Sequence, residues 1–365
     1  MKYSDRIAGV QAGMKRTGLD AVFLTPSTNL FYVAGIGGRM MERLSCCVIL
    51  SNSVHFVAPA FELGNLGEES RSLVECHGWS DGSGDPFEIV GRLLKGSRVK
   101  RAAIDRHAPS WVLTGLQKLI GESGWELADV LLDEMRIIKD EDEYRLIKAV
   151  QEKSCSAILR LIEHGIRGLT EREAARLLTG YSAERGVNEP SPIVASGPNS
   201  ALPHHSAGDR IIQEGDPVVF DFGGKDEETG YIADTTRTFV VGRIPDGFKE
   251  IYDTVLRANQ AAFDAIKPGL PCEDVDKAGR NVIEAAGYGE YFTHRIGHGL
   301  GLDVHEAPYI TSGNKTPLRP GNCFSDEPGI YLPGKFGVRI EDAIFIRQSG
   351  PERLTPLDHD LHVVN

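Results

Sequence analysis

The sequence is poor in cysteine, and the cysteines that it has form no recognisable pattern. None of the six stands in a C-x-x-C pair, and their spacing does not suggest a disulfide framework. We therefore expect them to be small buried side chains in a reducing compartment. They are Cys46, Cys47, Cys76, Cys155, Cys272 and Cys323.

Long apolar runs and an excess of basic residues are also missing. No run approaches the roughly 20 apolar residues that cross a bilayer, and Met1–Arg6 lacks the apolar core of a signal peptide. A formal charge of −12 argues against a nucleic-acid partner, which would require a basic face. With 41% hydrophobic and 25% charged residues, we expect a cytoplasmic globular protein that binds neither membrane nor nucleic acid.

The length of 365 residues predicts two domains, because it exceeds the usual size of one core. A charged junction at Met135–Glu143 leads into a long apolar-striped helix, so we place the boundary between domains 1–138 and 139–365. The first domain mixes helical and strand patterns, which predicts a small α/β domain. Its helical run is Asp5–Leu19, and its strand runs are Ala21–Leu24, Ser45–Leu50 and Ser53–Val57.

The second domain contains a faint internal repeat. A long helix ends at Gly165–Leu169, and Thr170 with Glu173 forms a capping box that opens another helix. About one hundred residues later, a helix from Ile251 ends near Lys267–Leu270, and Pro271–Asp274 starts the next. Because strand-rich sequence follows each helix pair, we predict two α+β halves, related by a pseudo-twofold axis, that enclose a site between their sheets.

The segment from His294 to Glu306 combines three histidines with three glycines. His294, His298 and His305 recur at intervals of four and seven residues. Histidine serves as a metal ligand or as a general acid or base near neutral pH, and glycine allows close approach of backbone or ligand. A glycine-rich loop with solvated histidines would show the same pattern, so the flanking sequence decides between the two.

Acidic residues lie in or beside four apolar, β-prone runs that flank this segment. Carboxylates buried in a sheet cost several kcal/mol unless they are paired or bind a metal. Two aspartates, two glutamates and one histidine would suit Mn²⁺, Fe²⁺, Co²⁺ or Zn²⁺. Four carboxylates for one imidazole match the charge of two ions better than that of one. The runs are Val218–Gly224, Tyr231–Thr238, Ser325–Tyr331 and Gly337–Asp342.

These motifs, in this order, resemble the pita-bread metallopeptidases of the Xaa-Pro group, which contains prolidase and aminopeptidase P. Leu19–Leu24 with Asn29–Tyr32 resembles the N-terminal domain of creatinase and prolidase. The resemblance implies an α+β chain in which a small α/β domain precedes a pita-bread catalytic domain with pseudo-twofold halves. It also implies a proline-containing peptide as substrate, and we expect a homodimer.

The resemblance further implies a dinuclear metal site. Asp234 and Glu341 correspond to carboxylates that bridge the two ions, Asp221 to a ligand of one ion, and His298 with Glu327 to ligands of the other. We expect Mn²⁺ or Co²⁺, with Zn²⁺ or Fe²⁺ as alternatives. A hydroxide bridging two such ions would attack the scissile carbonyl, which the ions polarise.

Further residues receive roles by the same resemblance. Glu327 corresponds to the general base, His305 to the group that stabilises the tetrahedral intermediate, and His204 to a substrate-side histidine. His294 is expected to line the pocket or to support a ligand from behind. Arg339 lies two positions before Glu341, so on a strand it could orient a carboxylate; the alternative is a surface residue. His205 suits a solvated loop as well as a functional role. No role is predicted for His55, His77, His107, His164, His359 and His362.

One departure concerns the thirteen positions that separate Asp221 from Asp234, two more than the family usually has. The intervening Lys225–Gly230 is polar and ends in glycine, which is typical of a hairpin tip. Two extra residues preserve the alternation of side chains along a strand, so both carboxylates should still share a face. We expect the acidic tip to be solvated and not to form another metal site.

The function predicted first is metal-dependent hydrolysis of the peptide bond preceding proline in Xaa-Pro dipeptides. The alternatives are an aminopeptidase P that acts on longer peptides and a catalytically silent binding module on the same fold. Creatinase works without metal and lacks the full ligand set that is present here. Methionine aminopeptidase shares the five ligands but generally lacks an N-terminal domain of this size.

Overall fold

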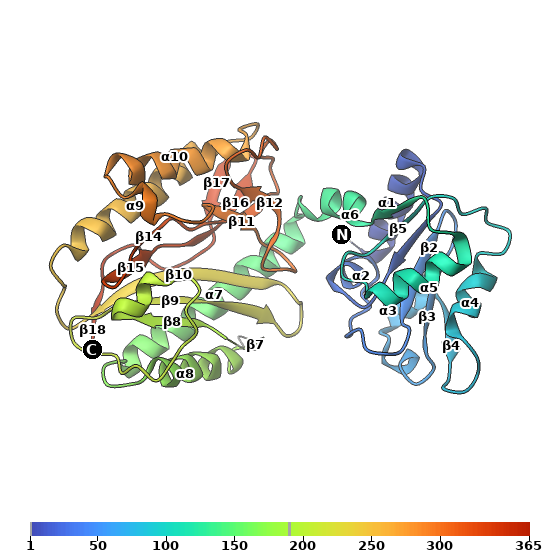
Figure 1. The fold of residues 1–365 in the computed structure, drawn as a ribbon, viewed down its shortest axis with the longest axis horizontal. Helices are drawn as coiled ribbons and strands as arrows, with labels where there is room; N and C mark the ends of the chain where they lie inside the picture. Colours follow the sequence, from blue (N-terminus) through green and yellow to red (C-terminus); the bar gives the residue numbers. More distant parts are fainter. Residues whose placement is uncertain (1, 189–190) are drawn as a thin grey trace. The chain divides into compact units, whose positions relative to one another are not determined.

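The computed structural model describes residues 2–188 and 191–365. The chain divides into two compact units, Met1–Arg136 and Ile137–Asn365, which we call the N-terminal and C-terminal units (Figure 1). Within the described ranges, no helix is long and apolar enough to cross a membrane. Five of the six cysteines are buried, Cys76 is half-buried, and all of them are free thiols. The expected absence of a disulfide framework therefore holds for these residues.

The N-terminal unit is built on a six-stranded mixed sheet of order β4-β3-β2-β1-β5-β6. β2 pairs antiparallel with β1 and β3, and the other pairs are parallel. The predicted helical run and the three predicted strand runs are confirmed, with ends shifted by one or two residues. The strands are β1 (Ala21–Leu24), β2 (Cys46–Leu50), β3 (Val54–Pro59), β4 (Glu75–Trp79), β5 (Ala102–Ile104) and β6 (Trp125–Leu127).

Helices surround this sheet, and apolar side chains from both kinds of element fill the core. Phe23 and Val48 of the sheet pack in one cluster with Val112 and Leu116 of α5. The helices are α1 (Tyr3–Thr17), α2 (Thr28–Ala34), α3 (Glu68–Leu73), α4 (Pro86–Leu93), α5 (Ser110–Ile120) and α6 (Asp129–Arg136), with a short 3-10 helix η1 (Leu63–Asn65).

The first half of the C-terminal unit consists of two helices followed by strands. α7 (Glu141–His164) buries Ile147, Val150, Ile158 and Leu161 on one face, so the helix predicted after the junction is present. The predicted capping box at Thr170 is present, since its hydroxyl accepts a hydrogen bond from the Glu173 N–H at 3.2 Å. α8 (Glu171–Ala183), β7 (Val187–Asn188), β8 (Ile193–Ser196), η2 (Gly197–Ala201), β9 (Pro217–Asp226) and β10 (Ile232–Val241) follow.

The second half repeats this order, as predicted from the sequence. α9 (Phe248–Ala265) and α10 (Cys272–Ala285) precede η3 (Gly289–Tyr291) and a run of strands. These form a sheet of order β12-β11-β13-β16-β17 and a hairpin β14-β15. The strands are β11 (Gly297–Gly299), β12 (Glu306–Ile310), β13 (Cys323–Asp326), β14 (Gly329–Leu332), β15 (Phe336–Arg339), β16 (Asp342–Arg347) and β17 (Gly350–Arg353); β18 (Val363–Val364) returns to pair with β10.

Each sheet has its own helix pair, so the C-terminal unit is layered as helices, sheet, sheet and helices (Figure 1). α7 and α8 share a core with β9 and β10, whereas α9 and α10 share one with β13, β15 and β16. The halves meet where Thr238 of β10 accepts a hydrogen bond from the Arg339 N–H at 3.1 Å and donates to its carbonyl at 2.9 Å. These hydrogen bonds between the Thr238 side chain and the Arg339 backbone hold residues of the two halves close together at this seam.

The hairpin β9–β10 contains the long spacing between the two aspartates. Asp221 lies opposite Thr236, and Asp234 lies opposite Gly223. Directly opposed residues share a face of a sheet, as do residues two apart along a strand. Both carboxylates therefore lie on one face, as the argument from alternation predicts.

The expectation of a wholly solvated hairpin tip is wrong at Asp226. Its carboxylate is buried, and it accepts a hydrogen bond from the Lys153 ammonium of α7 at 2.5 Å. The sequence alone does not show that α7 supplies this cation. Glu227 and Glu228, the other acidic residues of the tip, are exposed as expected.

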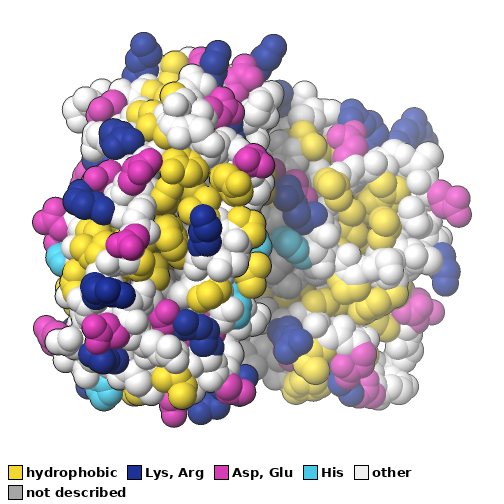
Figure 2. Space-filling view, turned by 60° about the vertical axis from the view of Figure 1, so that its left-hand side comes forward, with side chains coloured by type: hydrophobic (Ala, Val, Ile, Leu, Met, Phe, Trp, Pro, Cys, Tyr) yellow, Lys and Arg dark blue, Asp and Glu magenta, His cyan; other side chains and the backbone are white. Residues whose placement is uncertain are grey.

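Charged side chains of both signs are interspersed on the face of the molecule drawn in Figure 2. Lys and Arg side chains alternate there with Asp and Glu, and apolar side chains lie between them. Nucleic-acid binding would favour a single basic surface. Positive charge is not gathered into such a surface on this face.

Candidate active site

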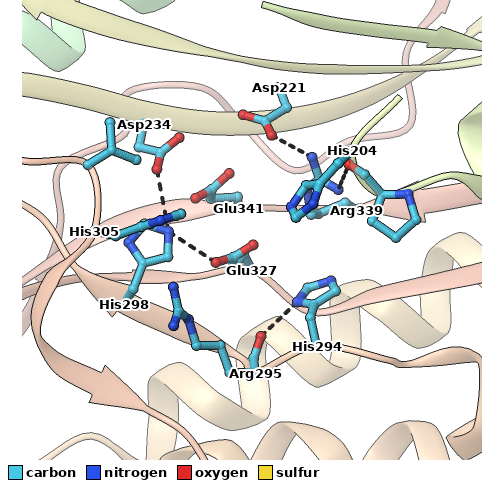
Figure 3. Close-up of a pocket in the computed structure, with 12 residues that line it drawn as sticks. His204, Asp221, Asp234, His294, Arg295, His298, His305, Glu327, Arg339 and Glu341 are labelled. Atoms are coloured by element: carbon cyan, nitrogen blue, oxygen red, sulfur yellow. Dashed lines mark hydrogen bonds and ion pairs between the residues drawn. The ribbon is translucent and has the colours of Figure 1, made fainter. Parts of the chain in front are cut away.

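A pocket of about 500 Å³ lies inside the C-terminal unit (Figure 3). It brings together every site residue predicted from the sequence, from both halves of the repeat. Its other lining residues are Pro203, Arg295 and Val304. The predicted ones are His204, Asp221, Asp234, His294, His298, His305, Glu327, Arg339 and Glu341.

The first half contributes Asp221 from β9 and Asp234 from β10. Gln151 of α7 fixes the backbone of Asp234, since its amide nitrogen donates to the Asp234 carbonyl and its amide oxygen accepts from the Asp234 N–H, both at 3.0 Å. Gln151 is fully buried. The position of this carboxylate therefore depends on a helix residue that lies 83 positions earlier in the chain.

The second half contributes His298 from the short strand β11, which lies between β12 and β13. The glycines on either side of His298 are required by this packing. A Cβ at Gly297 would lie 1.8 Å from the Ser325 carbonyl oxygen, and one at Gly299 would lie 2.3 Å from that of Ala307. The two glycines thus allow the backbone of the neighbouring strands to approach β11 closely.

Two glutamates complete the set from the same half. Glu327 follows directly after β13, and Glu341 joins β15 to β16. The Thr236 hydroxyl donates a hydrogen bond to Glu341 Oε2 at 2.7 Å, and the Ser325 hydroxyl donates to Glu327 Oε1 at 3.2 Å. Each carboxylate is therefore oriented by a hydroxyl that stands behind it.

The donor atoms converge closely enough to share a cation. His298 Nε2 lies 3.3 Å from Glu327 Oε1 and 3.6 Å from Asp234 Oδ2. One donor atom each from Asp234, His298 and Glu341 fall within 4.8 Å of one another. Ligands about 2.0–2.2 Å from a common ion stand about 3–3.6 Å apart when they are adjacent. These separations fit a transition-metal ion among the side chains.

The charges of the pocket also fit metal ions. Four carboxylates lie in this pocket together with the guanidinium of Arg339 and the imidazole of His298, and the Arg295 guanidinium also lines it. Burial and the neighbouring carboxylates hold the pKa of Asp234 and of Glu341 well above the usual range. Positive charge at this place would remove the repulsion, and divalent cations supply it without protonating the ligands.

Glu327 and His298 form a pair in which each group stabilises the charged form of the other. Burial raises the pKa of Glu327, but the hydrogen bond and the charge of His298 outweigh it and bring the pKa to about 2. Burial lowers the pKa of His298, and the bond to Glu327 outweighs it, so this pKa is raised. A bound cation would replace that proton, because a ligating imidazole is neutral.

Arg339 lies behind the carboxylates and is only 3% exposed, so the alternative of a surface residue is wrong. Its Nη2 donates to Asp221 Oδ2 at 2.6 Å, and its Nε donates to the Thr236 hydroxyl at 3.0 Å. Thr236 in turn contacts Glu341. One guanidinium thus orients ligands on both sides of the seam.

His294 is held at the pocket wall by two hydrogen bonds. Its Nδ1 lies 2.7 Å from the Arg295 carbonyl, and its Nε2 lies 2.8 Å from the Tyr331 hydroxyl. Tyr331 also accepts from Arg339 Nη1 at 2.9 Å. Because the carbonyl must accept, Nδ1 carries the proton, and Tyr331 donates to Nε2. Burial lowers the pKa of His294 and favours this neutral form.

His305 lies in the loop between β11 and β12, and its ring faces the pocket (Figure 3). The ring meets that of His298 edge-on, with centroids 4.1 Å apart. Loss of water around the ring, together with the charges of His298 and Arg295, lowers its pKa to about 4. At neutral pH, His305 is therefore an uncharged imidazole that can donate one hydrogen bond.

His204 and His205 are separated by the structure. His204 lines the pocket on the side of Arg339 (Figure 3). His205 instead contacts Glu171, with 2.8 Å between Nε2 and Oε2. Glu171 is fully buried and also accepts hydrogen bonds from Ser196 and Asn199. His205 therefore belongs to a polar network that holds the start of α8.

Sequence reasoning missed several residues that support this site. Thr236 could have been found, because it stands two positions after Asp234 and must share its face of β10. Tyr331 and Gln151 carry no such signal, since their contacts arise only when separate elements pack together. The role of Arg295 as a charged neighbour of His305 depends likewise on the loop conformation.

Comparison with known proteins identifies the family of the chain. Residues 145–348 match the metallopeptidase family M24, and residues 6–138 match the creatinase/prolidase N-terminal domain. A probable dipeptidase of Mycobacterium tuberculosis is 37% identical over 99% of this chain and 96% of its own. An Xaa-Pro dipeptidase of Pyrococcus horikoshii is 34% identical over 98% of this chain and 99% of its own.

A solved structure agrees over the full length. The crystal structure of a recombinant prolidase from Thermococcus sibiricus is 37% identical, covers 100% of both chains and has a TM-score of 0.93. The predicted fold class and the predicted metallopeptidase resemblance are confirmed by these matches. The chain therefore belongs to metallopeptidase family M24.

Proposed function

We propose that this protein is a metal-dependent Xaa-Pro dipeptidase that hydrolyses the peptide bond preceding proline. The observation that carries the proposal is the pocket in which Asp221, Asp234, His298, Glu327 and Glu341 converge. The relatives named as a dipeptidase, an Xaa-Pro dipeptidase and a prolidase support the reaction class, because they match nearly the whole chain.

We propose that the five residues hold two divalent ions, Mn²⁺ or Co²⁺. Asp234 and Glu341, from opposite halves, would bridge them; Asp221 would hold one ion, and His298 with Glu327 the other. The ions, when bound, supply a nucleophile at neutral pH and polarise the scissile carbonyl. An oxygen-rich donor set with a single imidazole supports this choice of metals.

The residues around the ions would have separate roles in proton transfer and in hydrogen bonding to the substrate. Glu327 faces the pocket, and we assign it the role of general base that the family resemblance implies. His305 is neutral and can donate a hydrogen bond to the oxyanion that develops on the substrate. His204 and His294 lie on the other side of the pocket and would contact the substrate (Figure 3).

The substrate length separates this proposal from the aminopeptidase alternative. Hydrolysis of Xaa-Pro and Xaa-Pro-Xaa peptides should be compared in the presence of Mn²⁺. We expect the dipeptide to be cleaved with the higher kcat/KM. Preference for the longer peptide would establish an aminopeptidase P, and no cleavage of either by metal-loaded protein would establish a silent binding module.

We also propose that the protein is a cytoplasmic homodimer and that its domains divide at residue 138. The buried free thiols support a reducing compartment. Light scattering on the purified protein tests the oligomeric state. A mass near 39.8 kDa would contradict the dimer, because that is the mass of one chain.

A further inference from the structure

A second cluster of metal-ligating side chains lies in the N-terminal unit, at one edge of its sheet. His55 belongs to β3, and Glu75 and His77 belong to the edge strand β4. The parallel register aligns His55 with Glu75 and Val57 with His77. Because side chains alternate along a strand, these three point to the same face of the sheet.

The three side chains are close enough to hold one small ion. His55 Nδ1 lies 3.2 Å from His77 Nε2 and 3.3 Å from Glu75 Oε2. His77 Nε2 lies 3.7 Å from Glu75 Oε1. In tetrahedral Zn²⁺ sites the bonds measure about 2.0–2.2 Å, which places the ligand atoms about 3.3–3.6 Å apart. The His55–His77 and His55–Glu75 separations match an edge of such a tetrahedron, and the third, to the other Glu75 oxygen, is slightly longer. One donor atom from each of the three residues falls within 4.8 Å of the others.

A hydroxyl outside the cluster prepares His55 for this role. The Ser53 hydroxyl oxygen lies 2.9 Å from His55 Nε2. When Nε2–H donates to Ser53, Nδ1 keeps a lone pair that faces His77 and Glu75. His55 is only 8% exposed, so its ring is held in place at the edge of the sheet.

We propose that His55, Glu75 and His77 form a Zn²⁺ site distinct from the pocket of the C-terminal unit. Two imidazoles and one carboxylate suit Zn²⁺, whereas the pocket offers four carboxylates and one ligating imidazole. The Glu75 side chain is 68% exposed, so a fourth position opens to water. The ion joins the edge strand β4 to β3 and thereby stabilises the end of the sheet.

The full-length protein should be dialysed against Zn²⁺, and bound zinc should be counted for the parent and for His77→Gln. We expect the variant to hold one zinc ion fewer per chain, whatever the pocket of the C-terminal unit retains. His107→Gln is the matched control, because His107 is an exposed histidine of the same unit outside the cluster. Equal zinc in the parent and His77→Gln would overturn the proposal, and so would an equal loss in the control.

Two further variants guard against a folding artefact. Glu75→Gln removes a ligand whose side chain is mostly exposed, so the fold should persist while the same zinc ion is lost. Ser53→Ala should leave the ligands in place and weaken zinc binding about 10–100-fold, as partners of ligating histidines do. If circular dichroism shows both variants folded and both bind zinc like the parent, the cluster is only a histidine–histidine contact.

Discussion

At the scale of the residue, His298 and His305 show how neighbouring imidazoles can serve different purposes. Their rings are 4.1 Å apart, yet His298 contacts Glu327 and Asp234, whereas His305 stands in a loop and stays neutral. A donor that acts on developing charge matters mainly in the transition state. The proposed division predicts that metal binding and turnover can be separated by mutation.

His305→Ala should lower kcat on the order of 10²–10³-fold, because it removes one oxyanion donor. Its metal content should equal that of the parent. His298→Ala, by contrast, deletes a ligand and should lose metal together with activity. Metal analysis and steady-state kinetics on both variants check this. Loss of metal from His305→Ala, or cleavage of Xaa-Pro at the parent rate, would show that the roles are misassigned.

Arg339→Met should destabilise the metal-free protein, because it leaves the half-buried Asp221 carboxylate without its cation. The loss should be smaller than that of about 3–5 kcal/mol for a fully buried pair. Arg339→Lys keeps the charge but cannot reproduce the contacts of the guanidinium with Asp221, Thr236 and Tyr331. We expect intermediate stability and reduced turnover for the lysine variant. Urea unfolding in the presence of a chelator measures the difference; unchanged midpoints for Arg339→Met would contradict the proposed ion pair.

At the scale of the element, β11 shows why the histidine motif needs its glycines. The strand fits between β12 and β13 only because Gly297 and Gly299 have no Cβ. The sequence indicated a close approach at these glycines but could not say whether ligand or backbone would make it. Pairing between strands distant in sequence decides that point.

Gly299→Ala should displace β11 and with it His298, so metal affinity and stability should fall together. Gly180→Ala in α8 is the matched control, because a Cβ there meets nothing within 4 Å. Alanine in a helix should stabilise that variant by about 0.5–1 kcal/mol. Thermal unfolding and metal titration of the two variants test the argument. A Gly299→Ala protein with parental metal affinity would show that β11 tolerates the added methyl group.

At the scale of the whole molecule, the sequence predicted the metal-ligating side chains of the pocket better than the residues that hold those side chains in place. Buried carboxylates in apolar strands are conspicuous, and the repeat of helix pairs places them in two facing sheets. The chain from Arg339 through Tyr331 to His294 joins separate elements, so no local pattern reveals it. His55 and His77 had no predicted role, because a parallel pairing brings them together and no turn sets its register.

Metal removal tests the molecule as a unit, because ligands from both halves meet at one centre. Without ions, the repulsion among buried carboxylates acts across the seam between the two sheets. Chelation should therefore abolish hydrolysis of Xaa-Pro and lower the unfolding temperature, and Mn²⁺ or Co²⁺ should restore both. At a hundredfold excess of ion over its Kd, binding should stabilise the fold by about 2.7 kcal/mol. Full hydrolysis by metal-stripped protein would exclude the proposed mechanism and favour creatinase-like chemistry. A stabilisation by Mn²⁺ that survives in Asp234→Asn/Glu341→Gln would show that the ions bind elsewhere.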